Sequence, residues 1–191
     1  PILVFQPVYS HFADVILENN RRLVVSELKL QNGHYEMDFE DLEKKIVAEK
    51  VKTILFCSPH NPGGRVWTRQ ELQTLAKIVQ KYGIRVISDE IHADFIYSGH
   101  QHVPFCTLSD YTQENTITCI APTKSFNLAA IQGAACIVPN GSLRLAVKKC
   151  GYANGIYGPS LTSAVAMEAA YKYGGPWFNG LLPIGRASCR E

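Results

Sequence analysis

The sequence lacks a strong charge bias. It carries 19 lysines and arginines against 17 aspartates and glutamates, a formal net charge of +2 at pH 7, with both signs interspersed. This balance excludes the strongly basic surfaces that bind nucleic acid or anionic membranes, so we expect neither partner. There is also no apolar run of about 20 residues, the length that a membrane-spanning helix needs.

Closely spaced cysteine pairs are missing too. The six cysteines are scattered along the chain: Cys57, Cys106, Cys119, Cys136, Cys150 and Cys189. No two of them have the C-x-x-C spacing of a zinc or redox site. Several lie inside apolar runs, where cysteine behaves as a small hydrophobic residue. We therefore expect a reducing, cytoplasmic compartment.

An initiator methionine is absent, and both ends of the chain look cut. The first ten residues, "PILVFQPVYS", begin inside a strand-like run, and the last eight, "IGRASCRE", break the preceding pattern. Those eight match one reading frame of a common sequencing adapter. We predict that Ile184–Glu191 is a non-native tail on a truncated chain, with an ordinary loop as the alternative.

What the sequence does contain is a folded core with alternating elements. It has 191 residues, of which 46% are hydrophobic, enough for one good-sized core and too apolar for a disordered chain. Short runs rich in β-branched and apolar residues predict buried strands. These runs are Ile2–Phe5, Leu23–Val25, Thr53–Cys57, Arg85–Ser88, Thr116–Ala121 and Ala134–Val138.

Three segments between or after these strands have helical patterns. Residues 37–50 offer Asp38 as an N-cap, and residues 68–83 open with a Thr68–Glu71 capping box and close at Gly83. The first segment has apolar residues at helical spacing: Leu42, Ile46 and Val47. The third segment, 159–175, is mostly small and apolar. Strands that alternate with helices predict a single α/β domain with a largely parallel sheet.

In such sheets, functional residues gather in the loops at the carboxyl ends of the strands. The first unusual loop follows the strand in "ILFCSPHNPGGRVWT". Its prolines and glycines fix a rigid turn that can aim the Asn61 amide, both donor and acceptor, into a cleft. A plain turn is the alternative.

The second unusual loop follows the strand in "RVISDEIHADFIY". An Asp at the end of a buried strand, here Asp89, needs a partner because an unpaired buried carboxylate is costly. A cationic ligand, a metal ion or a cap on the following segment could each satisfy it. Against a metal, Asp89 and Glu90 point to opposite faces if the strand continues. His100 and His102 could join such a cluster, but "GHQH" reads more simply as a polar loop, so we expect no metal.

The third loop, in "TCIAPTKSFNLAA", carries Lys124 directly after a strand. If buried, its amine would lose hydration and become a usable nucleophile or base. The alternative is a lysine that snorkels to water. Together, Asn61, Asp89 and a desolvated Lys124 at three successive strand ends suit pyridoxal phosphate. The lysine binds the cofactor covalently, the carboxylate keeps the pyridine nitrogen protonated, and the amide bonds the phenolic oxygen.

Longer stretches around these loops resemble a known family. "SPHNPGGRVWTRQEL", "VISDEIHADFIYSGHQHVPF" and "APTKSFNLAAIQG" are similar to the fold-type I pyridoxal phosphate enzymes of the aminotransferase class I/II superfamily, in particular its MalY/PatB branch of cystathionine or cysteine-S-conjugate β-lyases. The resemblance implies a three-layer αβα large domain, incomplete here, with residues 1–183 as its central part. It also implies roles for Tyr9, which stacks on the cofactor, and Thr123, which contacts the phosphate.

Two departures from the wider superfamily bear on the reaction. The residue three after Asp89 is His92, as in the lyase branch, where many aminotransferases have tyrosine. The residue eight after Lys124 is Gln132, where many have a phosphate-binding arginine. Backbone amides and helix N-termini would then compensate the phosphate charge. Both departures favour a lyase over a transaminase.

The resemblance therefore implies an enzyme: a carbon–sulfur β-lyase that acts on a small amino acid, with pyridoxal phosphate as cofactor and Lys124 as its catalytic base. The family also implies a cytoplasmic homodimer. An aminotransferase, or a non-catalytic regulatory or binding homologue, is the alternative. Because the family's phosphate-binding helix and substrate-carboxylate arginine are expected outside residues 1–183, we expect this chain alone to be inactive.

Overall fold

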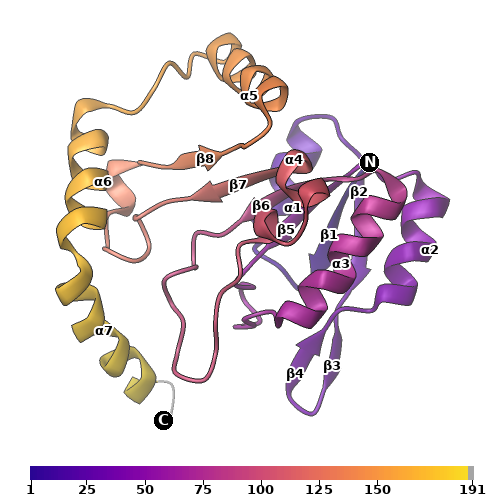
Figure 1. Cartoon of the computed structure of the whole chain (residues 1–191), viewed down its shortest axis with the longest axis horizontal. Helices are drawn as coiled ribbons and strands as arrows, with labels where there is room; N and C mark the ends of the chain where they lie inside the picture. Colours follow the sequence, from indigo (N-terminus) through magenta and orange to yellow (C-terminus); the bar gives the residue numbers. More distant parts are fainter. Residues whose placement is uncertain (189–191) are drawn as a thin grey trace.

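The computed structural model describes residues 1–188. Within them, six strands form the main sheet, in the order β2-β1-β5-β6-β7-β8 (Figure 1). The strands are β1 (Ile2–Gln6), β2 (Leu23–Glu27), β5 (Thr53–Cys57), β6 (Arg85–Asp89), β7 (Thr116–Ile120) and β8 (Ala135–Ile137). Neighbours pair in parallel except β7 and β8, which are antiparallel. The predicted α/β fold with a mostly parallel sheet is confirmed.

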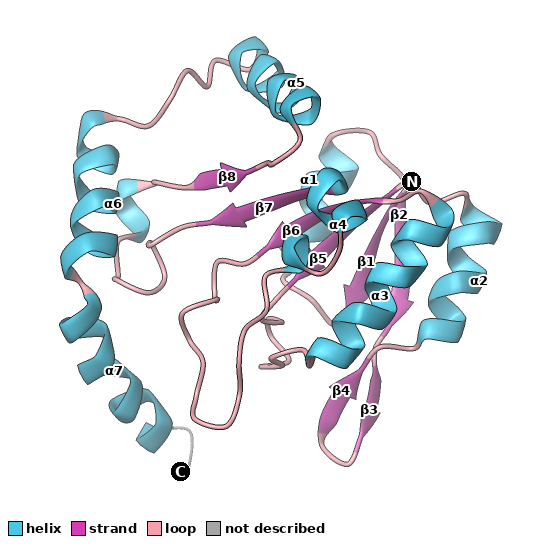
Figure 2. Cartoon of the chain, in the orientation of Figure 1, coloured by secondary structure: helices cyan, strands magenta, loops and turns pink. Residues whose placement is uncertain are grey.

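Helices and a small hairpin surround this sheet (Figure 2). The helices are α1 (His11–Glu18), α2 (Phe39–Glu49), α3 (Arg69–Tyr82), α4 (Asp110–Asn115), α5 (Gly141–Ala153), α6 (Leu161–Tyr173) and α7 (Gly175–Ser188), with short 3-10 turns η1 (Phe105–Thr107) and η2 (Ala129–Ile131). The hairpin pairs β3 (Lys29–Gln31) with β4 (His34–Glu36). No helix among the described residues has both the length and the hydropathy needed to cross a membrane.

The core lies on both faces of the sheet, because side chains of a strand alternate between faces. On one face, Phe5 and Phe56 pack with Leu42 of α2 and Leu75 of α3. On the other face, Val4 of β1 and Cys57 of β5 form a second buried cluster with Phe12 and Ile16 of α1. Helix, sheet and helix therefore form the three predicted layers.

Local signals explain where two of the helices begin and end. The Asp38 side chain accepts a hydrogen bond from the Asp41 amide and caps α2. The Thr68–Glu71 capping box is present at the start of α3, and Gly83 ends that helix with a positive φ of 64°. One residue of the predicted apolar stripe differs, since Val47 is 61% exposed. It lies about 100° around the helix from Ile46, on the solvent side.

The carboxyl-terminal part contains elements that the patterns did not predict, among them α5 and α7. Helix α7 runs through Ser188, so it includes most of the segment that we interpret as a non-native tail. Residues 189–191 of that segment lie outside the described residues. The origin of the tail stays a prediction.

Candidate active site

The register of the sheet brings three loops to one edge. Cys57 of β5 lies opposite Asp89 of β6, and Asp89 lies opposite Cys119 of β7. The backbone continues this alignment past the strand ends, because Ser58 N donates to Asp89 O and Glu90 N donates to Cys119 O, both at 2.9 Å. The loops that carry Asn61, Asp89 and Lys124 therefore start side by side at the carboxyl edge.

Asp89 is half-buried at the end of β6. Its Oδ1 accepts a hydrogen bond from the Ile91 amide at 3.1 Å, which is the capping contact considered above. Burial raises the pKa of the Asp89 carboxyl, while that hydrogen bond and the positive charges of His92 and Lys124 act in the opposite direction. A cation placed against this carboxylate would offset the cost of its burial.

His92 has a buried side-chain nitrogen, Nδ1, without a hydrogen-bond partner among the described residues, as do His60 and Arg65. Burial lowers the pKa of the imidazole, against the attraction of Asp89. A buried nitrogen without a partner is rare and calls for an explanation such as a missing ligand.

Lys124 is exposed, so the expectation of a desolvated lysine is wrong for this structure. The cause is the turn that follows β7, in which Phe126 N donates to Pro122 O and Leu128 N to Thr123 O. This turn buries the neighbouring Ser125, whose hydroxyl donates to Asp94 Oδ2 at 2.5 Å, and directs the lysine outward. The amine is thus open to a ligand.

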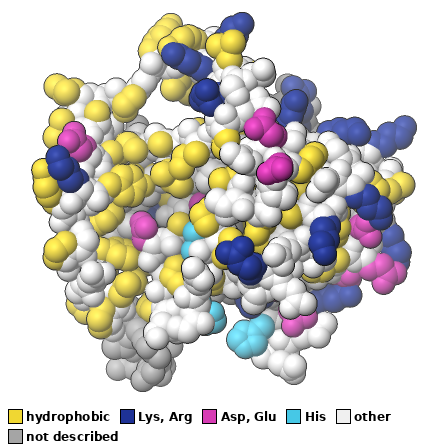
Figure 3. Space-filling model, in the orientation of Figure 1, with side chains coloured by type: hydrophobic (Ala, Val, Ile, Leu, Met, Phe, Trp, Pro, Cys, Tyr) yellow, Lys and Arg dark blue, Asp and Glu magenta, His cyan; other side chains and the backbone are white. Residues whose placement is uncertain are grey.

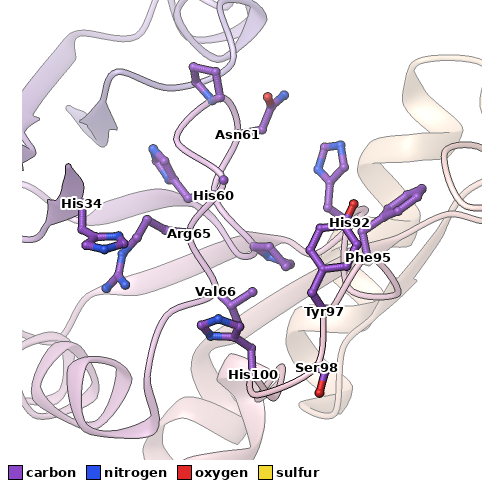
Figure 4. Close-up of a pocket in the computed structure, with 13 residues that line it drawn as sticks. His34, His60, Asn61, Arg65, Val66, His92, Phe95, Tyr97, Ser98 and His100 are labelled. Carbon is purple, nitrogen blue, oxygen red and sulfur yellow. The ribbon is translucent and has the colours of Figure 1, made fainter. Parts of the chain in front are cut away.

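The Asn61 loop borders a cavity of about 520 Å³ (Figure 4). Asn61 and His92 both line it, so the structure brings these two predicted residues together. The full lining is His34, Pro59, His60, Asn61, Pro62, Gly64, Arg65, Val66, His92, Phe95, Tyr97, Ser98 and His100. Asp89, Lys124, Tyr9 and Thr123 do not line it.

The turn around Asn61 is held by contacts that its sequence did not reveal. His60 is buried, and its Nε2 lies 2.7 Å from Pro7 O, which ties the turn to the loop after β1. His60 N donates to Arg65 O at 2.8 Å. A Cβ on Gly63 would lie 2.9 Å from Tyr35 Cδ2, so only glycine lets the turn pack this closely on β4. The Asn61 amide therefore sits on a fixed support.

Tyr9 and Thr123 lie at the same edge but have other contacts. Tyr9 follows β1, is 43% exposed, and meets the rings of His11 and Phe12 edge-on at 5.1 and 6.2 Å. Thr123 is half-buried and directly precedes the lysine. Their assigned cofactor contacts stay predictions.

Glu90, considered above as a metal ligand, is engaged elsewhere. Its buried carboxylate accepts hydrogen bonds from Ser88 Oγ at 2.8 Å and the Phe105 amide at 3.0 Å, and it lies 2.8 Å from His102 Nε2. These contacts anchor the loop between β6 and η1. In residues 1–188, no group of three or more His, Cys, Asp or Glu side chains is placed to hold a metal ion.

Chemically, this edge offers a half-buried carboxylate, an amide, a partnerless imidazole nitrogen and an accessible amine. The set suits a small aromatic ligand that presents a cationic ring nitrogen to Asp89 and an electrophilic carbon to Lys124.

Comparisons with known proteins identify the family of the chain. The family described as aminotransferase class I and II matches residues 1–174. The cystathionine β-lyase PatB of Bacillus subtilis is 39% identical over 181 residues, which are 95% of this chain and 47% of PatB. Protein MalY of Escherichia coli is 34% identical, over 94% of this chain and 46% of MalY.

The solved structure of a C–S lyase from Staphylococcus hominis, bound to pyridoxal phosphate, has the same fold. It is 35% identical and matches with a TM-score of 0.88, over 96% of this chain and 46% of that one. The chain thus spans about half the length of the relatives it matches. It belongs to the aminotransferase class I and II family.

Proposed function

We propose that residues 1–183 are the central part of the cofactor-binding domain of a pyridoxal phosphate-dependent carbon–sulfur β-lyase. The reaction is β-elimination of cystathionine or a cysteine conjugate to pyruvate, ammonia and a thiol. The observation that carries the proposal is the alignment of the Asn61, Asp89 and Lys124 loops at the ends of three adjacent parallel strands. The names of similar proteins, a cystathionine β-lyase and a C–S lyase, support it.

The described residues fit the cofactor in charge and in hydrogen bonding. Asp89 pairs with the protonated pyridine nitrogen, and this pairing relieves the burial that otherwise raises the pKa of its carboxyl. The Asn61 amide bonds the phenolic oxygen, and His92, whose Nδ1 has no partner among the described residues, lines the same cavity as Asn61. By the family resemblance, Tyr9 stacks on the ring and Thr123 contacts the phosphate.

Bound pyridoxal phosphate supplies an electron sink for the pair of electrons left when the substrate Cα–H bond breaks. Asp89 keeps the ring nitrogen protonated, which makes that sink effective. Lys124 Nζ would take the proton from Cα as general base; its side chain is exposed, so no packed group of the described chain covers it. Loss of the β-thiolate then completes the elimination, and one water converts the remaining enamine to pyruvate and ammonia.

We also propose that the enzyme is a cytoplasmic homodimer that acts on a small amino-acid substrate. Large apolar side chains that lie exposed near the carboxyl-terminal end, such as Tyr157, Val165 and Trp177, support an interface there. Because positively and negatively charged residues nearly balance, we expect no nucleic-acid partner.

The decisive experiment gives cystathionine to the complete protein that contains this chain, loaded with pyridoxal phosphate. We expect pyruvate and free thiol in equal amounts. Transfer of the amino group to a keto acid, without pyruvate, would identify an aminotransferase instead. We expect the 191-residue chain alone to show no turnover, and measurable activity of that chain would contradict this part.

A variant pair separates catalysis from a non-catalytic binding role. Lys124→Ala should lose both the visible absorbance of the covalently bound cofactor and all lyase turnover. Lys77→Ala, which removes an exposed lysine from α3, is the matched control and should keep both. If Lys124→Ala retained the absorbance, the assignment of this lysine would be wrong.

A further inference from the structure

Two cysteines face each other at the base of the loop that carries Thr123 and Lys124. This loop leaves β7 after Ile120 and returns in β8 at Ala135. Within this antiparallel pair, Cys119 lies directly opposite Cys136. Their Sγ atoms are 3.9 Å apart, and both thiols are free. No other two of the five described cysteines are in contact in this way.

The backbone geometry suits a disulfide. Residues directly opposite in an antiparallel ladder have Cα atoms about 4.5–5.5 Å apart, inside the range of about 4.4–6.8 Å that disulfides span. The two sulfurs are already in contact, so rotations about the Cα–Cβ bonds can bring them to bonding distance while both strands keep their places.

The two thiols also differ in reactivity. Cys136 is exposed on the edge strand, whereas Cys119 is half-buried. The hydrogen bond from Cys119 lowers the pKa of Cys136 to about 6, and the same bond, with burial, raises the pKa of Cys119. Cys136 is therefore the more accessible and the more acidic of the two thiols, and so the one that we expect an oxidant to reach first.

We propose that Cys119 and Cys136 form a peroxide-reactive dithiol whose oxidation to a disulfide closes the Lys124-bearing loop at its base. This proposal goes beyond the lyase function and does not depend on it. The contact between the thiols and the exposure of Cys136 carry it.

The reaction balances with hydrogen peroxide as the oxidant. The Cys136 thiolate attacks one peroxide oxygen, the O–O bond breaks, and Cys136 sulfenic acid and hydroxide form. Before oxidation, the Cys136 thiolate accepts the hydrogen bond from the Cys119 thiol. Oxidation of Cys136 removes this negative charge, so the Cys119 proton is held less tightly. Cys119 sulfur attacks the sulfenic sulfur, the S–S bond forms, the S–O bond breaks, and the released hydroxide and the Cys119 proton leave as water. Overall, the two sulfurs lose two electrons, and the peroxide becomes one water and one hydroxide; the proton that Cys136 gave up on ionising converts this hydroxide to a second water.

The test uses the full 191-residue chain, reduced and then treated with hydrogen peroxide at pH 7. Remaining thiols are alkylated in denaturant, and digested peptides are analysed by mass spectrometry. We expect a cross-link between the Cys119 and Cys136 peptides, and a fall from six free thiols to four. If both cysteines stay fully alkylated, or if the disulfide joins a different pair, the proposal is wrong.

Serine variants test the order of events. In Cys119→Ser, dimedone should label Cys136 as a trapped sulfenic acid, and labelling that avoids Cys136 would overturn its role as the attacking thiolate. Cys136→Ser should leave Cys119 reduced. Cys150→Ser, which removes another exposed thiol on α5, is the control and should still form the Cys119–Cys136 link. None of these readouts requires cofactor or turnover, so failure of the lyase proposal would not affect them.

Discussion

The two ends of the sheet differ in what holds their helices. Around β1, β5 and β6, helices α2 and α3 bury their apolar faces, and Leu42, Leu72 and Leu75 are at most 1% exposed. Beyond β7 and β8, α5 buries none of its residues and α6 buries only Ser163 and Ala170. Figure 3 shows hydrophobic side chains gathered on the left of the molecule, where α6 and α7 lie.

The helices of the second region also begin at side-chain caps, but they have little buried core beside them. Asn140 accepts from the Leu143 amide at 2.9 Å to cap α5, and Ser160 accepts from the Ser163 amide at 3.1 Å to cap α6. The first region is therefore stabilised by its own core. The second region keeps apolar surface available, as expected of an interface.

The largest effect should come from one leucine in each region. Leu75→Ala on α3 removes a side chain that is 0% exposed, so we expect a loss of about 2–5 kcal/mol in the free energy of unfolding. Leu145→Ala on α5 removes one that is 53% exposed, and we expect a change within about 0.5 kcal/mol. Denaturant unfolding monitored by circular dichroism measures both. Equal losses would show that α5 has a buried face after all.

A smaller contrast should come from the helix caps. Thr68→Ala removes the capping box of α3 and should cost about 1 kcal/mol of global stability, because α3 is part of the main core. Asn140→Ala should instead speed amide hydrogen exchange within α5 and leave the global unfolding midpoint nearly unchanged, because α5 can open locally. A large midpoint shift in Asn140→Ala would contradict the idea of two regions.

The same contrast explains what the sequence could predict. All six predicted strands end within two residues of their observed bounds, and Thr53–Cys57 matches fully. Five of them are apolar runs that the sheet buries at least in part, whereas β8 at the sheet edge is mostly exposed. The caps at Asp38, Thr68 and Gly83 are local signals and were found. Helix α5, which buries none of its residues, was missed, and so was the short helix α1, although it buries Phe12 and Ile16.

The site follows a similar rule. That Asn61, Asp89 and Lys124 start at one edge could be predicted, because parallel strands align their carboxyl ends. The exposure of Lys124 could not be predicted from the sequence. It depends on the hydrogen bond between Ser125 and Asp94, which joins two loops across 31 residues of sequence. The roles of His60 and Glu90 as loop anchors were hidden for the same reason.

At the site edge, unlike in the apolar core, one side chain makes the stability of the fold depend on pH. Burial raises the pKa of Asp89 in the folded chain, so the unfolded chain ionises first as the pH rises, and folding loses stability between the unfolded and folded pKa values. Asp89→Asn removes this cost. We expect the variant to melt at a modestly higher temperature than the parent at pH 7, with the difference vanishing near pH 3.

The matched control for that experiment is Asp14→Asn, which removes an exposed carboxylate from α1. It should show no comparable gain at pH 7. If Asp89→Asn instead lowered the melting temperature at pH 7, the carboxylate would be a stabilising group in the chain without ligand, and its assignment as the partner of a cofactor cation would lose its physical basis.

The smallest effect should come from surface ion pairs, where the two regions ought to behave alike. Lys44 pairs with Glu40 on α2 at 2.6 Å, and Lys172 pairs with Glu168 on α6 at 3.8 Å. All four side chains are well exposed, so water and salt screen both pairs. Lys44→Ala and Lys172→Ala should therefore leave the unfolding midpoint unchanged within error, at low and at high salt. If only Lys44→Ala lowered the unfolding midpoint, surface charge as well as burial would distinguish the two regions. If neither variant changes the midpoint, burial alone accounts for the contrast between Leu75 and Leu145.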